Sequence, residues 1–229
     1  LALSFNGVEH GDVVERRTPR IKDDTDVIVR VTTTAIGSRD LARYAGHDPA
    51  PGTIPGAEFC GLVDEVGAGV STVDLGDLVT GIGVFDSDNG RSGFGWDGLD
   101  GGQALYVRVP FANDTLLKVP TAGIEERALL LGDTYGLGAS AVDLATAHGA
   151  TDICVIGCDP YGASALIALA AAGITGVIGL DDEERRLGLA RRLGATMFDT
   201  SEEGVEGAVR EATGGSGFAA MVVGAGVYH

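Results

Sequence analysis

Two glycines in the second half of the chain have the spacing of a phosphate-binding turn. Gly157 and Gly162 bracket a short turn that follows the apolar run Ile153–Ile156 and precedes an alanine-rich stretch. In such turns one glycine allows the tight bend, another lets the backbone approach a pyrophosphate, and a third allows a helix to pack closely on a strand. The middle position here is Asp159. At ~4–5 Å its charge would repel a phosphate by roughly 3–4 kcal/mol before screening, so we expect any dinucleotide binding to be weak.

Asp181 ends the next predicted strand and has two interpretations. An acidic residue there hydrogen-bonds the adenosine ribose and disfavours a 2′-phosphate, which predicts NAD in preference to NADP. The alternative is a helix cap, because Asp181 opens an acidic stretch at the start of a helix, where negative charge is favourable. Both interpretations can hold together. The candidate cofactor-binding residues are Gly157, Pro160, Tyr161, Gly162, Asp181 and Arg186.

The charge balance argues against several classes of function. The 229 residues include 33 Asp and Glu against 16 Lys and Arg, a net charge of −17, which argues against binding to nucleic acid or to anionic membranes. This composition suits a protein solvated at high salt, and a GC-rich coding sequence would explain it equally well. Three cysteines without CxxC spacing predict a reducing cytoplasm and no disulfide framework. The longest apolar run, around 163–172, is too short to span a bilayer.

Short strands come first along the chain, and alternating strands and helices follow. Residues 27–34 alternate and are β-branched, residues 61–66 and 103–110 are also strand-like, and the glycine-rich interval 81–102 predicts a loop. This half predicts a small, partly closed β-barrel. From residue 153 onward, strands and helices alternate as in βαβ units of a parallel sheet. We therefore expect an α/β protein with two domains, residues 1–124 as the barrel and residues 125–229 as a linking helix and a nucleotide-binding sheet.

Ordered matches along nearly the whole chain point to one family. The matching segments are Asp26–Ile36, Ile54–Gly67, Asp100–Ala112, Leu131–Thr134 and Arg186–Ala195. Together they resemble the zinc-type medium-chain dehydrogenase/reductases, the alcohol dehydrogenase superfamily, and most of all its branch with glutathione-independent formaldehyde dehydrogenases and threonine dehydrogenases. The resemblance implies a GroES-like β-barrel domain followed by a Rossmann domain. We expect that second domain to be incomplete, because residues 222–229 look like its fourth strand and the turn after it.

The resemblance also locates the family's catalytic zinc, which polarises the substrate oxygen and needs three protein ligands. In similar enzymes the first two ligands are a cysteine after Thr-Ala-Ile and a histidine in a Gly-His-Glu segment. Here those positions are Gly37 and Ala57, which carry no donor atom. Only Glu58, beside the lost histidine, and Asp133, at the third ligand position, remain. The interval 80–101, where the family carries four structural cysteines, contains none, so we predict that both zinc ions are absent.

Arg39 stands where the resemblance places the proton-relay hydroxyl, with Ser38 beside it. We expect its guanidinium to occupy the place of the lost metal ion and to contact the two remaining carboxylates, because acidic groups left facing each other in a cleft need a cation. A solvated arginine and ordinary hydrogen-bonded carboxylates are the alternative. The candidate catalytic residues are Ser38, Arg39, Glu58 and Asp133.

Two functions remain open at this point. The first is an NAD(P)-linked oxidoreductase that acts on small alcohols or aldehydes without zinc. The second is a catalytically inactive, truncated remnant with weak or no nucleotide binding, and the chain could also be a fragment of a longer reading frame. A small alcohol or aldehyde is the expected partner if the protein is active. The oligomeric state stays open, because the family's dimer strands come after the fourth Rossmann strand.

Overall fold

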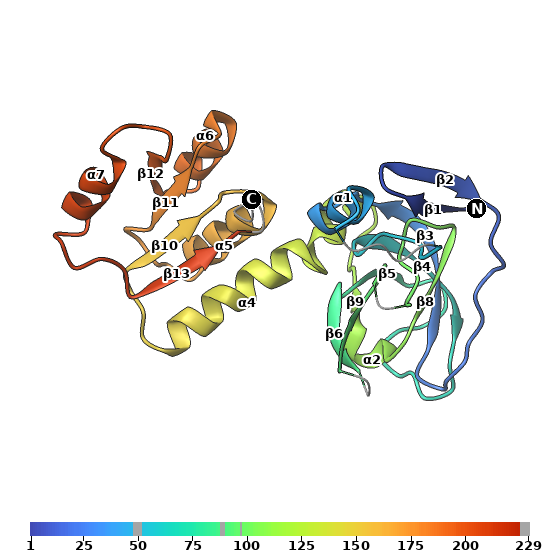
Figure 1. Cartoon of the computed structure of the whole chain (residues 1–229). Coiled ribbons are helices and arrows are strands. Elements are labelled where there is room, and N and C mark those ends of the chain that lie inside the picture. The colour runs from blue at the N-terminus through green and yellow to red at the C-terminus, as the bar shows by residue number, and fades with distance from the viewer. Residues whose placement is uncertain (48–51, 88–89, 97, 225–229) are drawn as a thin grey trace. The chain divides into compact units, whose positions relative to one another are not determined.

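The computed structural model describes residues 1–47, 52–87, 90–96 and 98–224. The chain divides into two compact units, Leu1–Asp133 and Thr134–His229 (Figure 1). Each unit has its own apolar core. This division falls after the expected boundary at residue 124. The reason is that α3 (Glu125–Ala128) and the 3₁₀ turn η1 (Leu129–Leu131) belong to the first unit, where Ala128 and Leu129 are buried together with Cys60.

The first unit is built on a five-stranded antiparallel sheet in the order β8-β3-β4-β5-β9. Side chains at alternate positions share a face of a strand, and the inward set, which includes Val27, Val29, Phe59 and Val107, forms the core. The expected GroES-like barrel is confirmed. The strands are β3 (Val27–Thr34), β4 (Phe59–Val66), β5 (Leu78–Gly81), β8 (Tyr106–Val109) and β9 (Leu116–Lys118).

Two hairpins complete this unit. One joins β1 (Ala2–Gly7) to β2 (His10–Val14), and the other joins β6 (Val84–Ser87) to β7 (Gly90–Gly93). The prediction of a loop throughout 81–102 was therefore wrong for this second hairpin, which forms because Phe85 packs against Phe94 in the barrel core with ring centroids 5.6 Å apart. Residues 88, 89 and 97 of that interval lie outside the described residues. Two short helices also belong to the unit, α1 (Ser38–Tyr44) and α2 (Ala112–Thr115).

The second unit is a four-stranded parallel sheet in the order β12-β11-β10-β13. This confirms the incomplete Rossmann domain, with the predicted fourth strand as β13; residues 225–229, the predicted turn after it, lie outside the described residues. The strands are β10 (Ile153–Ile156), β11 (Ile178–Asp181), β12 (Thr196–Asp199) and β13 (Ala220–Val223), and the helices are α4 (Thr134–Ala147), α5 (Pro160–Ala171), α6 (Glu184–Arg192) and α7 (Val205–Ala212).

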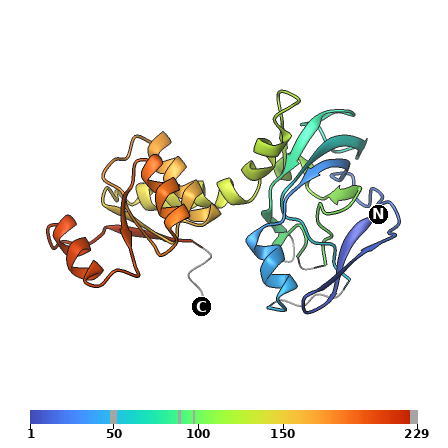
Figure 2. The same ribbon diagram turned by 90° about the horizontal axis from the view of Figure 1, so that it is seen from above.

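Helix α4 runs without interruption through Gly136 and Gly138. Gly138 lies against α5, and a Cβ atom there would come within 2.7 Å of the Ser164 side chain and the Ala165 backbone. The missing side chain thus allows α4 and α5 to pack side by side (Figure 2). Among the helices of the described residues, none has the length and apolar character that crossing a bilayer requires.

Candidate functional site

An arginine–aspartate ion pair lies at the position that the resemblance assigns to the catalytic metal. Arg39, in the first turn of α1, donates from Nη2 to Oδ1 of Asp133 at 3.2 Å. The Asp133 side chain is 3% exposed and that of Arg39 is 29% exposed. A charge-assisted bond of this kind stabilises a buried carboxylate that would otherwise be strongly destabilising. The expected contact with Asp133 is confirmed, and the further contact with Glu58 stays a prediction.

The guanidinium of Arg39 also lies close to Trp96, and one of its nitrogen atoms is buried. Its Cζ atom lies 6.0 Å from the centroid of the Trp96 ring, within the range of a cation–π interaction. Its Nη1 atom is buried and has no hydrogen-bond partner among the described residues. Arg39 therefore presents a fixed positive charge and a buried nitrogen whose hydrogen-bonding capacity the described residues do not use.

Two close backbone approaches position Asp133. A Cβ atom on Gly132 would collide with the carbonyl of Gly81, so only glycine fits between β5 and η1. Gly83 then donates its N–H to the Gly132 carbonyl at 3.0 Å. A side chain on Gly83 would come within 2.5 Å of the Asp133 carboxylate. The glycines thus fix the carboxylate beside the loop that precedes β6.

Asp40 organises the loops around this ion pair, and sequence reasoning missed it. It is 6% exposed and accepts N–H groups from Gly37 and Gly56, each at 2.9 Å, and the Gln103 side-chain amide at 3.2 Å. Burial raises the pKa of Asp40 above its ordinary value of 3.8, although these hydrogen bonds and the nearby Arg39 and Arg43 oppose the shift. Asp40 thereby joins the two backbone segments that carry Gly37 and Ala57, the positions of the missing zinc ligands.

The remaining predicted residues of this site are in place but supply no metal centre. Glu58 is 4% exposed and Ala57 is 5% exposed, while Ser38 is half-buried and opens α1. In the described part of the chain, no group of three or more His, Cys, Asp or Glu side chains could hold a metal ion. With a guanidinium on Asp133 and no donor atom at Gly37 or Ala57, the residues present do not fit a catalytic zinc.

The glycine-bearing turn of the second unit keeps the backbone of a dinucleotide-binding loop. Gly157 has φ +77°, the left-handed region that favours glycine. A Cβ atom on Gly162 would collide with the Gly157 carbonyl, so α5 can pack this closely only on glycine. Both glycines therefore have the structural roles that their spacing predicted.

The Asp159 side chain accepts hydrogen bonds from the backbone of this turn. Its Oδ1 accepts the N–H groups of Tyr161 and Gly162, at 3.1 and 3.0 Å, and so caps α5, whose first residue is Pro160. The Asp159 residue is 6% exposed. N–H groups at a helix N-terminus are the donors that a bound phosphate uses, and here a carboxylate of the chain occupies two of them. A pyrophosphate at this turn would therefore compete with the Asp159 carboxylate for the N–H groups of Tyr161 and Gly162.

Asp181 is likewise committed to the protein. Its Oδ2 accepts the Cys158 N–H at 2.6 Å, and its Oδ1 accepts the N–H groups of Asp182 and Glu183, each at 2.9 Å. Arg186 pairs with the same Oδ1 at 3.1 Å. Asp181 thus secures the glycine-bearing turn to the start of α6, which favours the capping interpretation of this residue. The structure brings together Gly157, Pro160, Tyr161, Gly162, Asp181 and Arg186 around one end of the sheet.

The three cysteines are free and buried. Burial, together with the charges of Asp181 and Asp159, raises the pKa of Cys158 to about 12. Burial, and to a smaller extent Glu125, raises the pKa of Cys60 to about 11. At neutral pH these side chains are thiols, and thiolates are the forms that attack carbon or bind metal.

Comparison with known proteins agrees with this architecture. Residues 23–121 match the alcohol dehydrogenase GroES-like domain. The chain is 37% identical to zinc-type alcohol dehydrogenase B of Aspergillus flavus over 96% of its own length, but it covers only 57% of that protein. It is 33% identical to a medium-chain reductase/dehydrogenase of Acremonium sp. and covers 84% of it.

Solved structures show the same relationship. The alcohol dehydrogenase of Thermus sp. ATN1 superimposes with a TM-score of 0.87 and 29% identity, over 97% of this chain and 69% of that enzyme. Identity, coverage and fold agree with one another. The chain belongs to the medium-chain dehydrogenase/reductase family, whose members include the zinc-type alcohol dehydrogenases.

Proposed function

We propose that the protein is an oxidoreductase of small alcohols or aldehydes in which Arg39 takes over the oxygen-binding role of zinc. The observation that carries this proposal is the Arg39 guanidinium, which Asp133 anchors at 3.2 Å while its buried Nη1 has no partner among the described residues. A partly buried cation with unused N–H capacity is suited to bind a carbonyl or alkoxide oxygen.

The chemistry of Arg39 resembles that of a metal ion in one respect. A guanidinium does not lose its proton at ordinary pH, so it stabilises negative charge on the oxygen but does not itself donate a proton to it. A separate group must move the proton, and Ser38, next to Arg39 at the start of α1, is the candidate for that step. The ion pair with Asp133 would neutralise the charge of Arg39 and so prevent it from binding anions indiscriminately.

Hydride chemistry in this family implies a nicotinamide dinucleotide, and we propose weak binding of NAD. Gly157, Gly162, Asp181 and Arg186 are the residues that would hold it. Asp159 occupies the Tyr161 and Gly162 N–H groups, so the dinucleotide would have to compete with a carboxylate of the chain.

A specific observation favours a second candidate, a non-catalytic protein that retains the family fold. Both features that bind ligands in the family are occupied by side chains of this chain, Arg39 in the first unit and Asp159 in the second. Such a protein would bind NAD weakly or not at all, and substitution of Arg39 would affect its stability alone.

Assays of reductase activity separate the two candidates. Wild-type protein, Arg39→Lys and Arg39→Met would be assayed with short-chain aldehydes and NADH in metal-free buffer, with and without a chelator. If Arg39 binds the oxygen, the wild type is active regardless of chelator, and Arg39→Met loses about 100-fold or more in kcat/KM, whereas Arg39→Lys keeps part of the rate. Elemental analysis after incubation with zinc provides the control, and stoichiometric tightly bound zinc would contradict zinc independence. Absence of turnover by folded wild type, with no NAD binding in calorimetry, would leave the non-catalytic candidate.

A further inference from the structure

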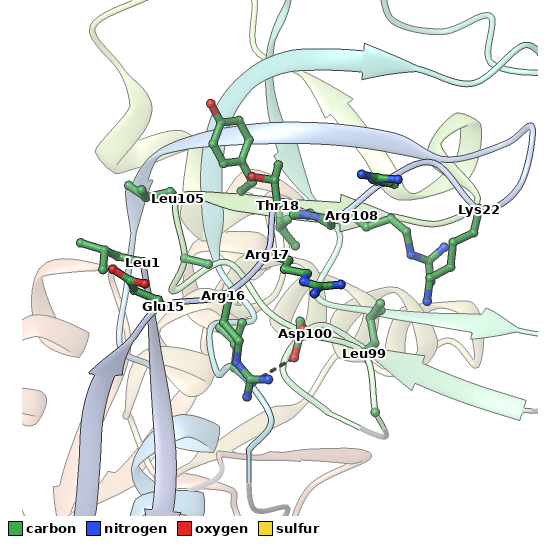
Figure 3. Close-up of a pocket in the computed structure, with 17 residues that line it drawn as sticks. Leu1, Glu15, Arg16, Arg17, Thr18, Lys22, Leu99, Asp100, Leu105 and Arg108 are labelled. Atoms are coloured by element: carbon green, nitrogen blue, oxygen red, sulfur yellow. Dashed lines mark hydrogen bonds between the residues drawn. The ribbon is translucent and has the colours of Figure 1, made fainter.

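A cavity lies in the first unit, on residues that the candidate site does not use. It has a volume of about 600 Å³ and lies between the segment that follows β2 and the start of β8 (Figure 3). This is within the size range of pockets that hold small molecules. None of Ser38, Arg39, Glu58 and Asp133 lines it, so an inference drawn from it stands apart from the function proposed above.

The lining of this cavity is basic although the whole chain is strongly acidic. The chain has only 16 basic side chains against 33 acidic ones, yet the cavity is lined by Arg16, Arg17, Arg20, Lys22 and Arg108, with Glu15 and Asp100 as its acidic residues. In the view of Figure 3, Arg17 and Arg108 lie between Leu105 and Leu99. Basic residues gathered in one cavity create a locally positive potential in a chain whose net charge is −17.

Two of these arginines serve the fold. Arg108 donates from Nη1 to both carboxylate oxygens of Asp26, at 2.8 and 2.9 Å, and Asp26 is fully buried. Asp26 also accepts the N–H groups of Lys22 and Asp23, at 2.8 and 3.1 Å. Arg16 donates to the Gly52 carbonyl. These bonds anchor the segment that follows β2 on the barrel, so the cavity has a fixed wall.

The other three basic side chains carry charge that the fold does not use. In the described residues, the side chains of Arg17, Arg20 and Lys22 make no ion pair and no hydrogen bond. All three residues are exposed. Cations left unpaired beside one another in a protein with abundant carboxylates are available to an anionic ligand, which arginine binds through paired N–H donors.

The lining of the cavity is also partly apolar. The cavity is also lined by Ile54, Leu99, Leu105 and Tyr106. Leu105 is 53% exposed, so its side chain is accessible to a ligand in the cavity. The cavity thus offers two kinds of surface to a single ligand, a cluster of cations and an apolar side.

We propose that this cavity binds a small phosphate ester with an apolar body. The phosphate would lie on Arg17, Arg20 and Lys22, and the apolar part would lie along Leu105 and Tyr106. A nucleic-acid strand is a poorer fit, because the net charge of −17 on the chain repels an extended polyanion, while a small ligand contacts the basic residues alone.

The proposal is tested by calorimetric titration of the whole chain at low ionic strength, with 1-naphthyl phosphate and inorganic phosphate as probes. We expect saturable 1:1 binding of 1-naphthyl phosphate, weakened about tenfold or more by Arg17→Glu and by Arg20→Glu. Arg91→Glu, an exposed arginine in β7 outside the cavity, makes the same change in net charge and should alter the affinity less than about twofold. These arginines are exposed, so the variants should keep the wild-type melting temperature, which is measured alongside.

A second variant tests the apolar wall. Leu105→Gln should reduce the preference for 1-naphthyl phosphate over inorganic phosphate while leaving the affinity for inorganic phosphate unchanged. Equal weakening by Arg17→Glu and Arg91→Glu would show a general charge effect and overturn the site. Failure of folded wild type to bind either probe would overturn it as well, and neither result bears on the reductase assays of the Arg39 variants.

Discussion

The metal position of the first unit and the glycine-bearing turn of the second unit have been altered in opposite ways. In the first unit, the family binds a cationic metal ion at the position where this chain has the guanidinium of Arg39 paired with Asp133. In the second unit, the family binds an anionic pyrophosphate at the turn where, in this chain, the carboxylate of Asp159 accepts the N–H groups of Tyr161 and Gly162. Each ligand position is occupied by a side chain that carries the charge of the ligand.

This comparison shows how side chains of the chain itself can contact groups that a bound ligand contacts elsewhere in the family. A buried carboxylate such as Asp133 and the free N–H groups of a helix N-terminus are both costly without a partner. An internal side chain of the right charge removes that cost and occupies the space at the same time. The two side chains differ in how much they stabilise the fold, because Arg39 neutralises a buried charge whereas Asp159 satisfies neutral N–H groups. We therefore expect substitutions in the first unit to have the larger effects.

The largest effect is expected for Arg39→Ala. Removing the guanidinium leaves the carboxylate of Asp133, which is 3% exposed, without this charge partner, and breaking a buried pair in this way costs about 3 kcal/mol of unfolding free energy. Urea denaturation measures the loss. Adding Asp133→Asn to Arg39→Ala should restore most of it, because the uncompensated charge is then removed as well.

The pair of Lys118 and Asp77 is the matched control for this prediction. It is shorter, at 2.6 Å, but the lysine side chain is 52% exposed. Lys118→Ala should therefore cost less than about 1 kcal/mol. Equal costs for Lys118→Ala and Arg39→Ala would mean that the Arg39 pair is screened by solvent, and the proposed difference between the two units would lose its physical basis.

The next effect concerns NAD affinity and acts through Asp159. Asp159→Gly removes both the charge and the bulk from the turn, so NAD should bind about fivefold more tightly or better in calorimetry. Asp159→Asn retains an oxygen that can cap the helix but removes the charge, so its affinity should lie between those of wild type and Asp159→Gly. An unchanged affinity in both variants would show that the side chain does not compete with the pyrophosphate.

The same residue should contribute to stability as a helix cap. Replacing an N-cap aspartate by alanine costs about 1 kcal/mol of unfolding free energy, whereas replacing it by glycine costs only a few tenths of a kcal/mol. Asp159→Ala should therefore lower the free energy of unfolding more than Asp159→Gly, while Asp159→Asn should be nearly neutral. If Asp159→Ala is as stable as wild type, the two hydrogen bonds from Tyr161 and Gly162 contribute little, and Asp159 is not a partner for the helix comparable to Arg39 for Asp133.

Much of the fold could be predicted from the sequence because its signals are local. Strand β3 occupies Val27–Thr34 as its alternation indicates, and the strands and helices from β10 onward follow the change of period. The hairpin β6–β7 escaped prediction, because Phe85 is held by Phe94, a contact across the core that short-range pattern does not show. The fold class could therefore be predicted from the sequence, whereas the β6–β7 hairpin depends on tertiary packing.

The candidate site was less predictable, and the reason is sequence separation. Arg39 and Asp133 are 94 residues apart, and only the family resemblance suggested that they meet. Asp40 accepts from Gly56 and Gln103, which are 16 and 63 residues distant, so no local pattern indicated its role. The cap by Asp159 did have a local signal, an aspartate directly before a proline at a helix start, but we interpreted that residue only through its repulsion of phosphate.

The smallest effect is expected at Asp40, and its sign follows from burial. Because the pKa of Asp40 is raised above 3.8 in the folded protein, the folded state binds the proton more tightly than the unfolded state does. The stabilising contribution of the protonated group is thus complete below pH 3.8 and is lost as pH rises through the higher folded-state pKa. Relative to Asp40→Asn, wild type should lose stability over that interval and then level off.

Asp77 has a pKa lowered first by its hydrogen bond with Lys118, so its contribution should instead be lost as pH falls below 3.8. Denaturation of wild type, Asp40→Asn and Asp77→Asn across acid pH measures both slopes. Equal signs would mean that the hydrogen bonds from Gly37 and Gly56 outweigh burial at Asp40, and that the loops around Arg39 are held by an ionised carboxylate.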